Sequence, residues 1–355
     1  MRMIKSPDNK SFSTAPRRGF VLITVLLLVV LLTAVLLRFN QAARTHLSTA
    51  TAHTQRLRAR YLARAGLDLA LAVLRQNPDP FSNETLCRML DETTMLHLDG
   101  AACEITLACE NGKLNVNRLR DKAGRPDRAR LDQFLNLFDR LNRRASHTPS
   151  LGYGIAPALL DWIDPDDHIT VLPFVSRANA GAESDYYASF KIPRPCGNRP
   201  LETIAELRFV REVPPEWFIP SPPASPQAPP STSDSPPPIL PDVLTVYGEG
   251  LLDLNTAPPL VIQSLSERLT PDLARRIVKR RREQPFTSVT QLKELPGFPQ
   301  RDLPTIARLC KLRPTTRYYT ITARAAETSA PVAITAVIKT NMASQKVDIV
   351  LYQEK

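Results

Sequence analysis

An uninterrupted apolar run lies near the start of the chain, and basic residues precede it. From Phe20 to Leu37 only Thr24 and Thr33 break the series of hydrocarbon side chains. About eighteen helical residues span ~27 Å, which is close to the hydrocarbon thickness of a bilayer. Because positive charge tends to remain in the cytoplasm, we expect residues 1–18 to stay there and the rest of the chain to cross the membrane.

After the apolar run the pattern still predicts a helix, but one with an apolar face and a polar face. No proline occurs between residues 38 and 77, and apolar residues recur at steps of four. This predicted stripe consists of Leu57, Tyr61, Ala65, Leu69 and Val73, flanked by Leu62 and Ala72. Most arginines lie off the stripe. We therefore predict one continuous helix over 20–76 that buries the stripe and ends at the Asn-Pro-Asp-Pro sequence 77–80.

Alternating apolar and polar residues predict strands on both sides of a long helical region. A strand is predicted over 101–110, and Asn111-Gly112 predicts a hairpin to a returning strand over 113–117. Three more alternating segments, the last two joined by a short turn, cover 319–324, 332–338 and 347–351. Helical spacing dominates between them, over 131–141, 157–163, 201–210 and 258–310. We predict an α+β fold with a large, mainly helical domain inserted between the strands of one antiparallel sheet.

Composition narrows the classes of function. Glycine is scarce (12) and proline abundant (33), which argues against Gly-rich nucleotide-binding loops. The formal net charge is +11, which is compatible with an acidic partner or a membrane surface. The sequence contains no G-x-S-x-G, H-E-x-x-H, Walker or G-x-G-x-x-G pattern. Its five cysteines are too scattered for a disulfide scaffold or a zinc motif, and we expect a non-enzymatic protein.

Acidic residues are densest just after the predicted helix 157–163. The group comprises Asp161, Asp164, Asp166, Asp167, Glu183 and Asp185. Hard oxygen ligands without a nearby cysteine favour calcium over zinc or copper, although the spacing is not that of an EF-hand. Two alternatives stay open. One is a solvated acidic loop with helix-capping aspartates, and the other is a catalytic carboxylate pair in a membrane-anchored, metal-dependent hydrolase.

Several motifs resemble those of one family. The basic leader, Gly19-Phe20 and the apolar helix that continues as an amphipathic one resemble type IV prepilins. Further segments look like the type II secretion minor pseudopilin K (general secretion pathway protein K) family, in order along the chain: 112–117 (GKLNVN), 160–167 (LDWIDPDD), 181–187 (GAESDYY), 199–201 (RPL) with 206–208 (ELR), 246–250 (VYGEG) and 253–259 (DLNTAPP). The resemblance covers nearly the whole chain. It implies a pilin-like sheet and a structural calcium ion at the acidic residues.

The resemblance also implies processing and a location. Prepilin peptidase would cleave between Gly19 and Phe20 and methylate Phe20, leaving the apolar segment at the N-terminus of the mature protein. An uncleaved membrane anchor is the alternative. The mature chain would then be a single-pass protein of a bacterial inner membrane, with its C-terminal body in the periplasm.

Thr24 bears on the place of the subunit in an assembly. Prepilins carry a glutamate at the fifth position after the cleavage site, where its carboxylate pairs with the N-terminal amine of a neighbouring subunit. Counted from Phe20, that position is Thr24, and members of the K family are similar in lacking the glutamate. The resemblance implies a minor pseudopilin at the pseudopilus tip, which initiates or caps assembly for protein export across the outer membrane. Its partners would be the I and J minor pseudopilins and the major pseudopilin.

The segment 242–313 resembles the helix-hairpin-helix domains of DNA-binding proteins. Its basic side chains at the positions of phosphate contacts are Arg275, Arg276, Lys279, Arg280, Arg281 and Arg282. The first connection has no glycine, and Pro299 removes an amide donor near Gly297. We therefore expect the fold without the phosphate cradle, and no nucleic acid as a partner. The alternative function is a DNA-uptake or adhesion-type minor pilin that binds nucleic acid through this region.

The chain thus divides into four predicted parts. They are a prepilin-type leader (1–19), a membrane-spanning and amphipathic pilin helix (20–76), a pilin-like sheet (77–119 and 314–355) and a helical insertion domain (120–313). The insertion contains an extended, Pro-rich loop (219–241) and the helix-hairpin-helix-like region (242–313).

Overall fold

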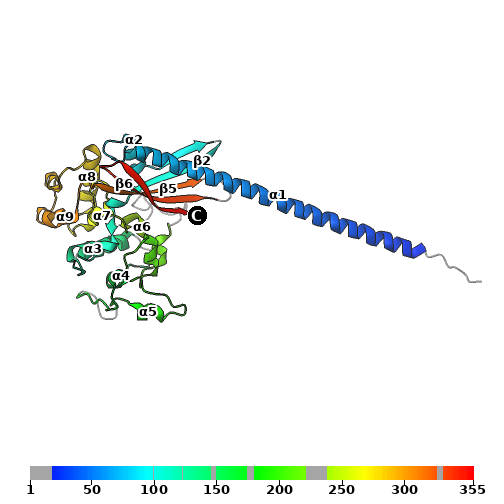
Figure 1. The fold of residues 1–355 in the computed structure, drawn as a ribbon, viewed down its shortest axis with the longest axis horizontal. Helices are drawn as coiled ribbons and strands as arrows, with labels where there is room; N and C mark the ends of the chain where they lie inside the picture. The colour runs from blue at the N-terminus through cyan, green and yellow to red at the C-terminus, as the bar shows by residue number, and fades with distance from the viewer. Residues whose placement is uncertain are drawn as a thin grey trace, which may run out of the picture.

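A single long helix dominates the outline of the molecule (Figure 1). The computed structural model describes residues 18–98, 100–121, 123–144, 149–173, 180–220, 238–325 and 331–355, so most of the leader (1–17) and of the Pro-rich loop (221–237) lies outside the described residues. Helix α1 (Arg18–Gln76) is continuous, as the sequence predicts. Its most apolar window has a mean hydropathy of 3.3, and none of that window is buried in the body. Pro78 has no N–H with which to continue the helix.

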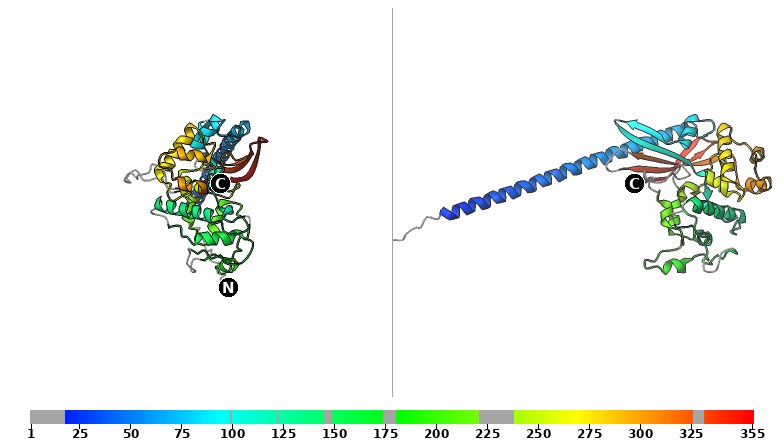
Figure 2. Two further views of the ribbon diagram at one scale, coloured as in Figure 1. Left: turned by 90° about the vertical axis from the view of Figure 1, so that its left-hand side faces the viewer. Right: turned by 180° about the vertical axis from the view of Figure 1, so that it is seen from behind.

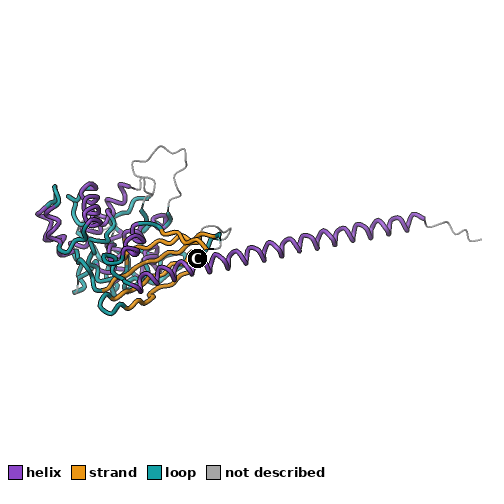
Figure 3. Tube along the Cα trace, turned by 90° about the horizontal axis from the view of Figure 1, so that it is seen from above, coloured by secondary structure: helices purple, strands orange, loops and turns teal. Residues whose placement is uncertain are grey.

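The strands form one antiparallel sheet beside the C-terminal half of α1 (Figures 1 and 3). In the described residues the sheet has five strands, in the order β1-β2-β5-β6-β7. Their bounds are β1 (Thr94–Leu98), β2 (Ala101–Cys109), β5 (Thr316–Ala325), β6 (Ala333–Asn341) and β7 (Lys346–Glu354). The three predicted C-terminal strands are confirmed. β2 pairs directly with β5, with Cys109 opposite Tyr319, although the whole helical region separates them in the sequence.

The hairpin predicted at Asn111-Gly112 is wrong. β2 forms its hairpin with the preceding strand β1 instead. The residues after Gly112 form the short strand β3 (Leu114–Asn115), which is parallel to β4 (Leu244–Thr245) in a separate two-stranded sheet. The chain therefore leaves the main sheet at this point and enters the helical region.

The side chain of Asn111 explains why this pair does not turn the chain back. Its Nδ2 donates to the Thr316 carbonyl oxygen at 3.1 Å, and its Oδ1 accepts from the Tyr318 N–H at 2.8 Å. Gly112 packs against the Thr256 backbone, where a Cβ would lie 2.6 Å from the carbonyl carbon. The Asn-Gly pair thus anchors the entrance of the helical region to β5.

The face of α1 that packs on the sheet is not the predicted stripe. The buried side chains of the helix are Ala59, Leu62, Ala63, Leu67, Ala70, Leu71 and Leu74. Tyr61 is 73% exposed, Leu57 38% and Leu69 40%, and we call these three side chains the outer stripe. Small residues allow the sheet to approach, since a Cβ on Gly66 would lie 2.8 Å from the Cys103 Sγ. The helix has two apolar faces, and the one rich in alanine and glycine lies against its own sheet.

The region between β2 and β5 folds around its own core. One cluster of core side chains joins α1, α2 (Glu84–Asp91) and the sheet, and a second, separate cluster is built from residues 114–310. The α-helices of this second region are α3 (Arg128–Arg144), α4 (Ile155–Ile163), α5 (Ser184–Ala188), α6 (Leu240–Val243), α7 (Pro259–Ser264), α8 (Pro271–Glu283) and α9 (Leu303–Leu309). Figure 2 shows it beside and beyond the end of α1 that is farthest from the apolar half. The predicted α+β fold with an inserted, mainly helical domain is confirmed.

Short 3-10 helices connect many of these elements. They are η1 (Glu110–Gly112), η2 (Val116–Arg118), η4 (Ile204–Phe209), η5 (Pro215–Phe218), η6 (Val289–Glu294) and η7 (Gln300–Asp302). The predicted helix over 201–210 is therefore a 3-10 helix rather than an α-helix. Its Thr203 and Glu206 form a reciprocal capping box at the start of η4, which holds a short turn without extending it.

One buried ion pair joins the sheet to the inserted region. Arg317 of β5 donates through Nη1 to Asp253 Oδ2 at 2.7 Å, and the two side chains are 1% and 0% exposed. Burial raises the pKa of Asp253, and the positive charge of Arg317 opposes that shift. The Asp253 N–H also donates to the Asn111 carbonyl oxygen at 2.8 Å. Because a buried charge without its partner is costly, this pair fixes how the inserted region sits on the sheet.

Removing one partner of this pair should cost more stability than removing both. We expect Arg317→Met to lower the free energy of unfolding by about 3–5 kcal/mol, because Asp253 stays buried and unpaired. The double variant Arg317→Met/Asp253→Leu should recover much of that loss in denaturant unfolding. Arg275→Met breaks the exposed Arg275–Asp272 pair and should leave the unfolding midpoint nearly unchanged. A double variant as unstable as the sum of its single variants would contradict this account.

Candidate metal centre

The end of α4 and the start of α5 bring acidic residues together from two segments. Every residue of α4 is buried, including Asp161, and the helix ends at Asp164. The Asp164 backbone is extended, with φ −89° and ψ 161°, so the chain leaves the helix axis and passes through Asp166. The chain returns at Glu183, the N-cap residue of α5, whose side chain makes no capping hydrogen bond. The Glu183 carboxylate is therefore available to the residues at the end of α4.

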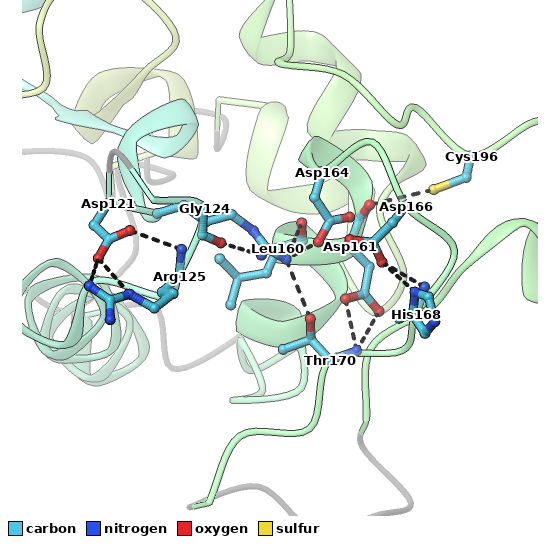
Figure 4. A network of polar contacts seen from close by, with 11 residues as sticks. Asp121, Gly124, Arg125, Leu160, Asp161, Asp164, Asp166, His168, Thr170 and Cys196 are labelled. Carbon is cyan, nitrogen blue, oxygen red and sulfur yellow. Dashed lines mark hydrogen bonds and ion pairs between the residues drawn. The ribbon is translucent and has the colours of Figure 1, made fainter.

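Three of the six predicted acids converge. One carboxylate oxygen each from Asp164, Asp166 and Glu183 lies within 4.8 Å of the others, and we call these three residues the acidic cluster. Asp164 and Glu183 are 5% and 4% exposed, whereas Asp166 is exposed. Figure 4 shows Asp164 and Asp166 at the end of α4, with Asp161 beside them. Two carboxylates of the cluster are thus buried, and the third is open to solvent.

The carboxylates of the acidic cluster have too little positive charge around them. One Asp164 oxygen forms an ion pair with Arg120, but Asp164 Oδ1 and both Glu183 oxygens have no hydrogen-bond partner among the described residues. Burial, followed by the charges of Asp161 and Asp164, raises the pKa of Glu183 to about 8. Burial also raises the pKa of Asp164 to about 6, although Arg120 opposes the shift. Buried, unpaired and mutually repelling oxygens are stabilised by a divalent cation.

The other three predicted acids stand outside the cluster. Asp161 accepts a hydrogen bond from the Thr170 N–H at 3.0 Å and packs under Gly181, where a Cβ would overlap its carboxylate. Asp167 accepts hydrogen bonds from two neighbouring polar side chains. Asp185 is exposed on α5. Asp161 therefore supports the segment that carries Glu183, while Asp167 and Asp185 have other surroundings.

Sequence reasoning missed Arg120 and Gly181. Arg120 precedes Asp164 by 44 residues, and it also donates to the Leu160 carbonyl oxygen at 3.3 Å. Only the packing of the region between η2 and α3 against α4 brings it there. Gly181 did carry a signal, because it opens the motif that contains Glu183, but its role is close packing on Asp161 rather than a turn.

The donor set fits a hard cation. Carboxylate oxygens are the preferred ligands of calcium, whereas zinc and copper favour thiolate and imidazole. Burial raises the pKa of the nearby Cys196 thiol to about 11, so this group stays protonated and is a poor ligand. His168 is exposed and contacts Asp166 Oδ1 at 3.1 Å. The residues that would hold a calcium ion are Asp164, Asp166 and Glu183.

The basic residues of α8 are mostly engaged within the protein. Arg281 donates to the carbonyl oxygens of Leu254 and Ala257 at 2.8 and 2.6 Å. Intramolecular acceptors also engage Arg275, Arg276, Arg280 and Arg282. Of the six predicted phosphate-contact residues, Lys279 alone has no such partner in the described part of the chain. Side chains that already bond internal acceptors are poorly placed to follow a phosphate backbone.

The Thr24 side chain is satisfied within α1. Its Oγ1 lies 2.9 Å from both the Phe20 and the Val21 carbonyl oxygens and donates back to the preceding turn. A hydroxyl bonded in this way is tolerated in an apolar helix and carries no charge. Thr24 therefore offers no carboxylate to an amine of another subunit.

Comparisons with known proteins agree with this architecture. Two family models, both described as type II secretion system (T2SS), protein K, match residues 112–219 and 252–309. Type II secretion system protein K of Klebsiella pneumoniae is 24% identical over 197 residues, which span 55% of this chain and 57% of that protein. The solved GspK-GspI-GspJ complex of the enterotoxigenic Escherichia coli type 2 secretion system contains a chain with a similar fold. The TM-score is 0.59 and the identity 16%, over 86% of this chain and 99% of that chain.

An exposed apolar helix whose other half packs on an antiparallel sheet defines a pilin-like subunit with a potential single-pass membrane anchor. Both matched ranges lie in the inserted region, and the first contains the acidic cluster. These two matches and the K. pneumoniae relative support the predicted family, the type II secretion system protein K family.

Gly181→Ala should disturb the support beneath the acidic cluster. The added methyl group overlaps the Asp161 carboxylate, so Asp161 must move away from the Thr170 N–H. We expect a loss of about 1–3 kcal/mol in the free energy of unfolding, measured with denaturant. Gly152→Ala is the matched control, because its Cβ would have no neighbour closer than 3.6 Å. Equal losses in the two variants would refute the packing argument.

Proposed function

We propose that this protein is the tip subunit of the type II secretion pseudopilus, where it initiates or caps assembly for protein export across the outer membrane. The observation that carries the proposal is Thr24, which stands where prepilins have the assembly glutamate. Its hydroxyl bonds back to its own helix, so the subunit has no charge with which to join beneath a neighbour. A subunit with nothing above it does not need that contact.

The inserted region supplies a steric reason for the same position. It lies beside and beyond the end of α1 that is opposite the apolar half (Figures 1 and 2). Bulk at that end obstructs the addition of another subunit above it. The N-terminal half of α1 stays exposed and free to contact subunits below.

We further propose that α1 is processed and inserted as in prepilins. Prepilin peptidase cuts between Gly19 and Phe20 and methylates Phe20. The exposed apolar window then anchors the subunit in the bacterial inner membrane as a single pass. Because the basic residues hold 1–18 in the cytoplasm before cleavage, the body lies in the periplasm. The role is structural, and we propose no catalytic activity.

The outer stripe supports other pseudopilin helices as partners. Leu57, Tyr61 and Leu69 lie on the α1 face that points away from the sheet, and they continue the exposed surface of the apolar half. Burying such apolar side chains against another helix would favour association. The chain of similar fold was solved together with GspI and GspJ. We therefore propose the minor pseudopilins I and J as direct partners, with the major pseudopilin below them.

Photocrosslinking from the outer stripe tests the tip position. Leu57→Cys in a Cys87→Ser background places one exposed thiol on the stripe, since the other four cysteines are buried. Labelled with a benzophenone maleimide in cells that carry all pseudopilins, this variant should crosslink to the I and J subunits. Arg56→Cys, at an exposed position of the same helix that lies off the stripe, is the control and should give fewer of these adducts. Adducts mainly with the major pseudopilin, or a ladder of adducts along the fibre, would overturn the proposal.

We also propose a structural calcium ion at Asp164, Asp166 and Glu183. The orphaned oxygens of the buried Glu183 and Asp164 support it, as does the clustering of three carboxylates within 4.8 Å. A bound ion would supply the positive charge that Arg120 gives only to Asp164. It would join the segment after α4 to the start of α5.

Chelation should lower the melting temperature of the full chain in detergent. An ion at about a hundredfold excess over its Kd stabilises a folded protein by roughly 2.7 kcal/mol, so calcium should raise the melting temperature relative to EDTA. Glu183→Gln should abolish this difference, whereas Asp185→Asn, exposed and outside the cluster, should retain it. Wild-type melting curves that coincide with and without calcium would exclude the ion.

The alternative functions find less support. A DNA-uptake pilin would need free phosphate contacts on α8, where five of the six basic residues already have internal acceptors. For a metal-dependent hydrolase, the sequence offers no H-E-x-x-H motif. Neither arrangement explains why α1 presents two apolar faces.

A further inference from the structure

A small cavity lies where the inserted region meets the sheet, apart from the acidic cluster. It has a volume of about 220 Å³, and its lining includes Arg118, Glu249, Lys311, Thr316, Tyr318 and Lys339. This volume is below the ~300–1,000 Å³ of pockets for drug-sized ligands, yet well above the ~30 Å³ that one water molecule occupies in the liquid. The cavity therefore suits a small ion or molecule.

Positive charge exceeds negative charge in this lining. Glu249 is already paired with Lys311, with 2.7 Å between its Oε2 and the lysine Nζ. In the part of the chain that the structure describes, neither Arg118 nor Lys339 has a side-chain hydrogen bond or ion pair. Two cations thus line the cavity without a counter-charge.

The acid opposite Lys339 on the neighbouring strand is already paired with another lysine. Asp348 stands opposite Lys339 in the β6–β7 register, but it pairs with Lys346 at 3.2 Å. Tyr318 stands opposite Lys339 on the other side, across β5–β6, and belongs to the same cavity lining. The amine of Lys339 is therefore held at the cavity by the sheet while its charge stays unmatched.

Arg118 is held in place by its packing rather than by a carboxylate. Gly250 has φ +79°, and a Cβ there would lie 2.5 Å from the Arg118 Cγ. Arg130 donates to the Gly250 carbonyl oxygen and approaches Asp127 at 3.5 Å, and Arg308 approaches the same Asp127 at 3.0 Å. Burial lowers the pKa of Arg130, and the charges of Arg118 and Arg308 lower it further. Arg130 and Arg308 thus share the Asp127 carboxylate, whereas Arg118 has no ion pair among the described residues.

We propose that this cavity binds a small tetrahedral oxyanion of the sulfate or phosphate class between Arg118 and Lys339. The planar guanidinium offers paired donors to an oxyanion, and the ammonium adds a compact positive charge. The backbone N–H groups of Gly248, Glu249 and Leu251, which line the cavity, donate to no acceptor among the described residues. A bound oxyanion would bridge the inserted region and β6 independently of the assembly role.

Isothermal titration of the full chain in a non-ionic detergent tests this site. Sodium sulfate and sodium phosphate, titrated at constant ionic strength against a chloride blank, should each bind saturably to one site. A separate titration with glycerophosphate distinguishes the binding of a free oxyanion from the binding of a phosphate ester. Arg118→Gln and Lys339→Gln should each weaken binding by roughly tenfold or more, because each removes a charge-assisted contact. Lys279→Gln, which removes an unpartnered lysine on α8, should leave binding unchanged.

Two results would overturn the proposal. One is the absence of saturable binding of all three oxyanions by the wild-type chain. The other is unchanged affinity in both Lys339→Gln and Arg118→Gln. Arg118 and Lys339 are both exposed, so both variants are expected to fold and either one tests the site.

Discussion

The direct pairing of β2 with β5 is the constraint on which the rest of the structure depends. Cys109 lies opposite Tyr319, so a region with its own core must begin and end at neighbouring strands. Backbone pairing alone would let such a region pivot about its two connections. The fully buried Arg317–Asp253 pair and the Asn111 bonds to β5 prevent this, because moving the region would expose or separate buried charges. These buried polar groups thus help to set the orientation of the inserted region.

That orientation connects the fold to its place in an assembly. A pilin-like body needs one face of α1 for its own sheet, and this protein uses the alanine- and glycine-rich face. The larger outer-stripe side chains stay exposed. In the proposed tip position, the inserted region beyond the far end of the helix would leave contacts along α1 open and obstruct contacts above the body. One helix would then serve internal packing, membrane insertion and association without a change of conformation.

The spacing of apolar residues predicted which helices and strands form, but not which elements pack or pair with one another. Alternation located the strands near the C-terminus, and the apolar run continuing to Gln76 located α1. The buried face of α1 was not predictable, because both faces are apolar and only the tight fit of Gly66 on Cys103 decides between them. The Asn-Gly signal failed for a similar reason, since Asn111 bonds to residues of β5 that lie far along the chain. In the candidate site, residue chemistry pointed to the acids, whereas Arg120 depended on tertiary packing.

The acidic cluster and the buried ion pair both place carboxylates away from water, but they differ in how the carboxylate charge is balanced. Asp253 has its counter-charge within the chain, but Glu183 is almost as buried and has none. Among the described residues, the chain after α4 forms the short α5 and irregular turns, with scattered backbone hydrogen bonds between them. If a calcium ion ties them, its affinity need only match the ~10⁻⁴–10⁻³ M range of extracellular modules. The inserted region would then reach its full rigidity only after crossing the membrane.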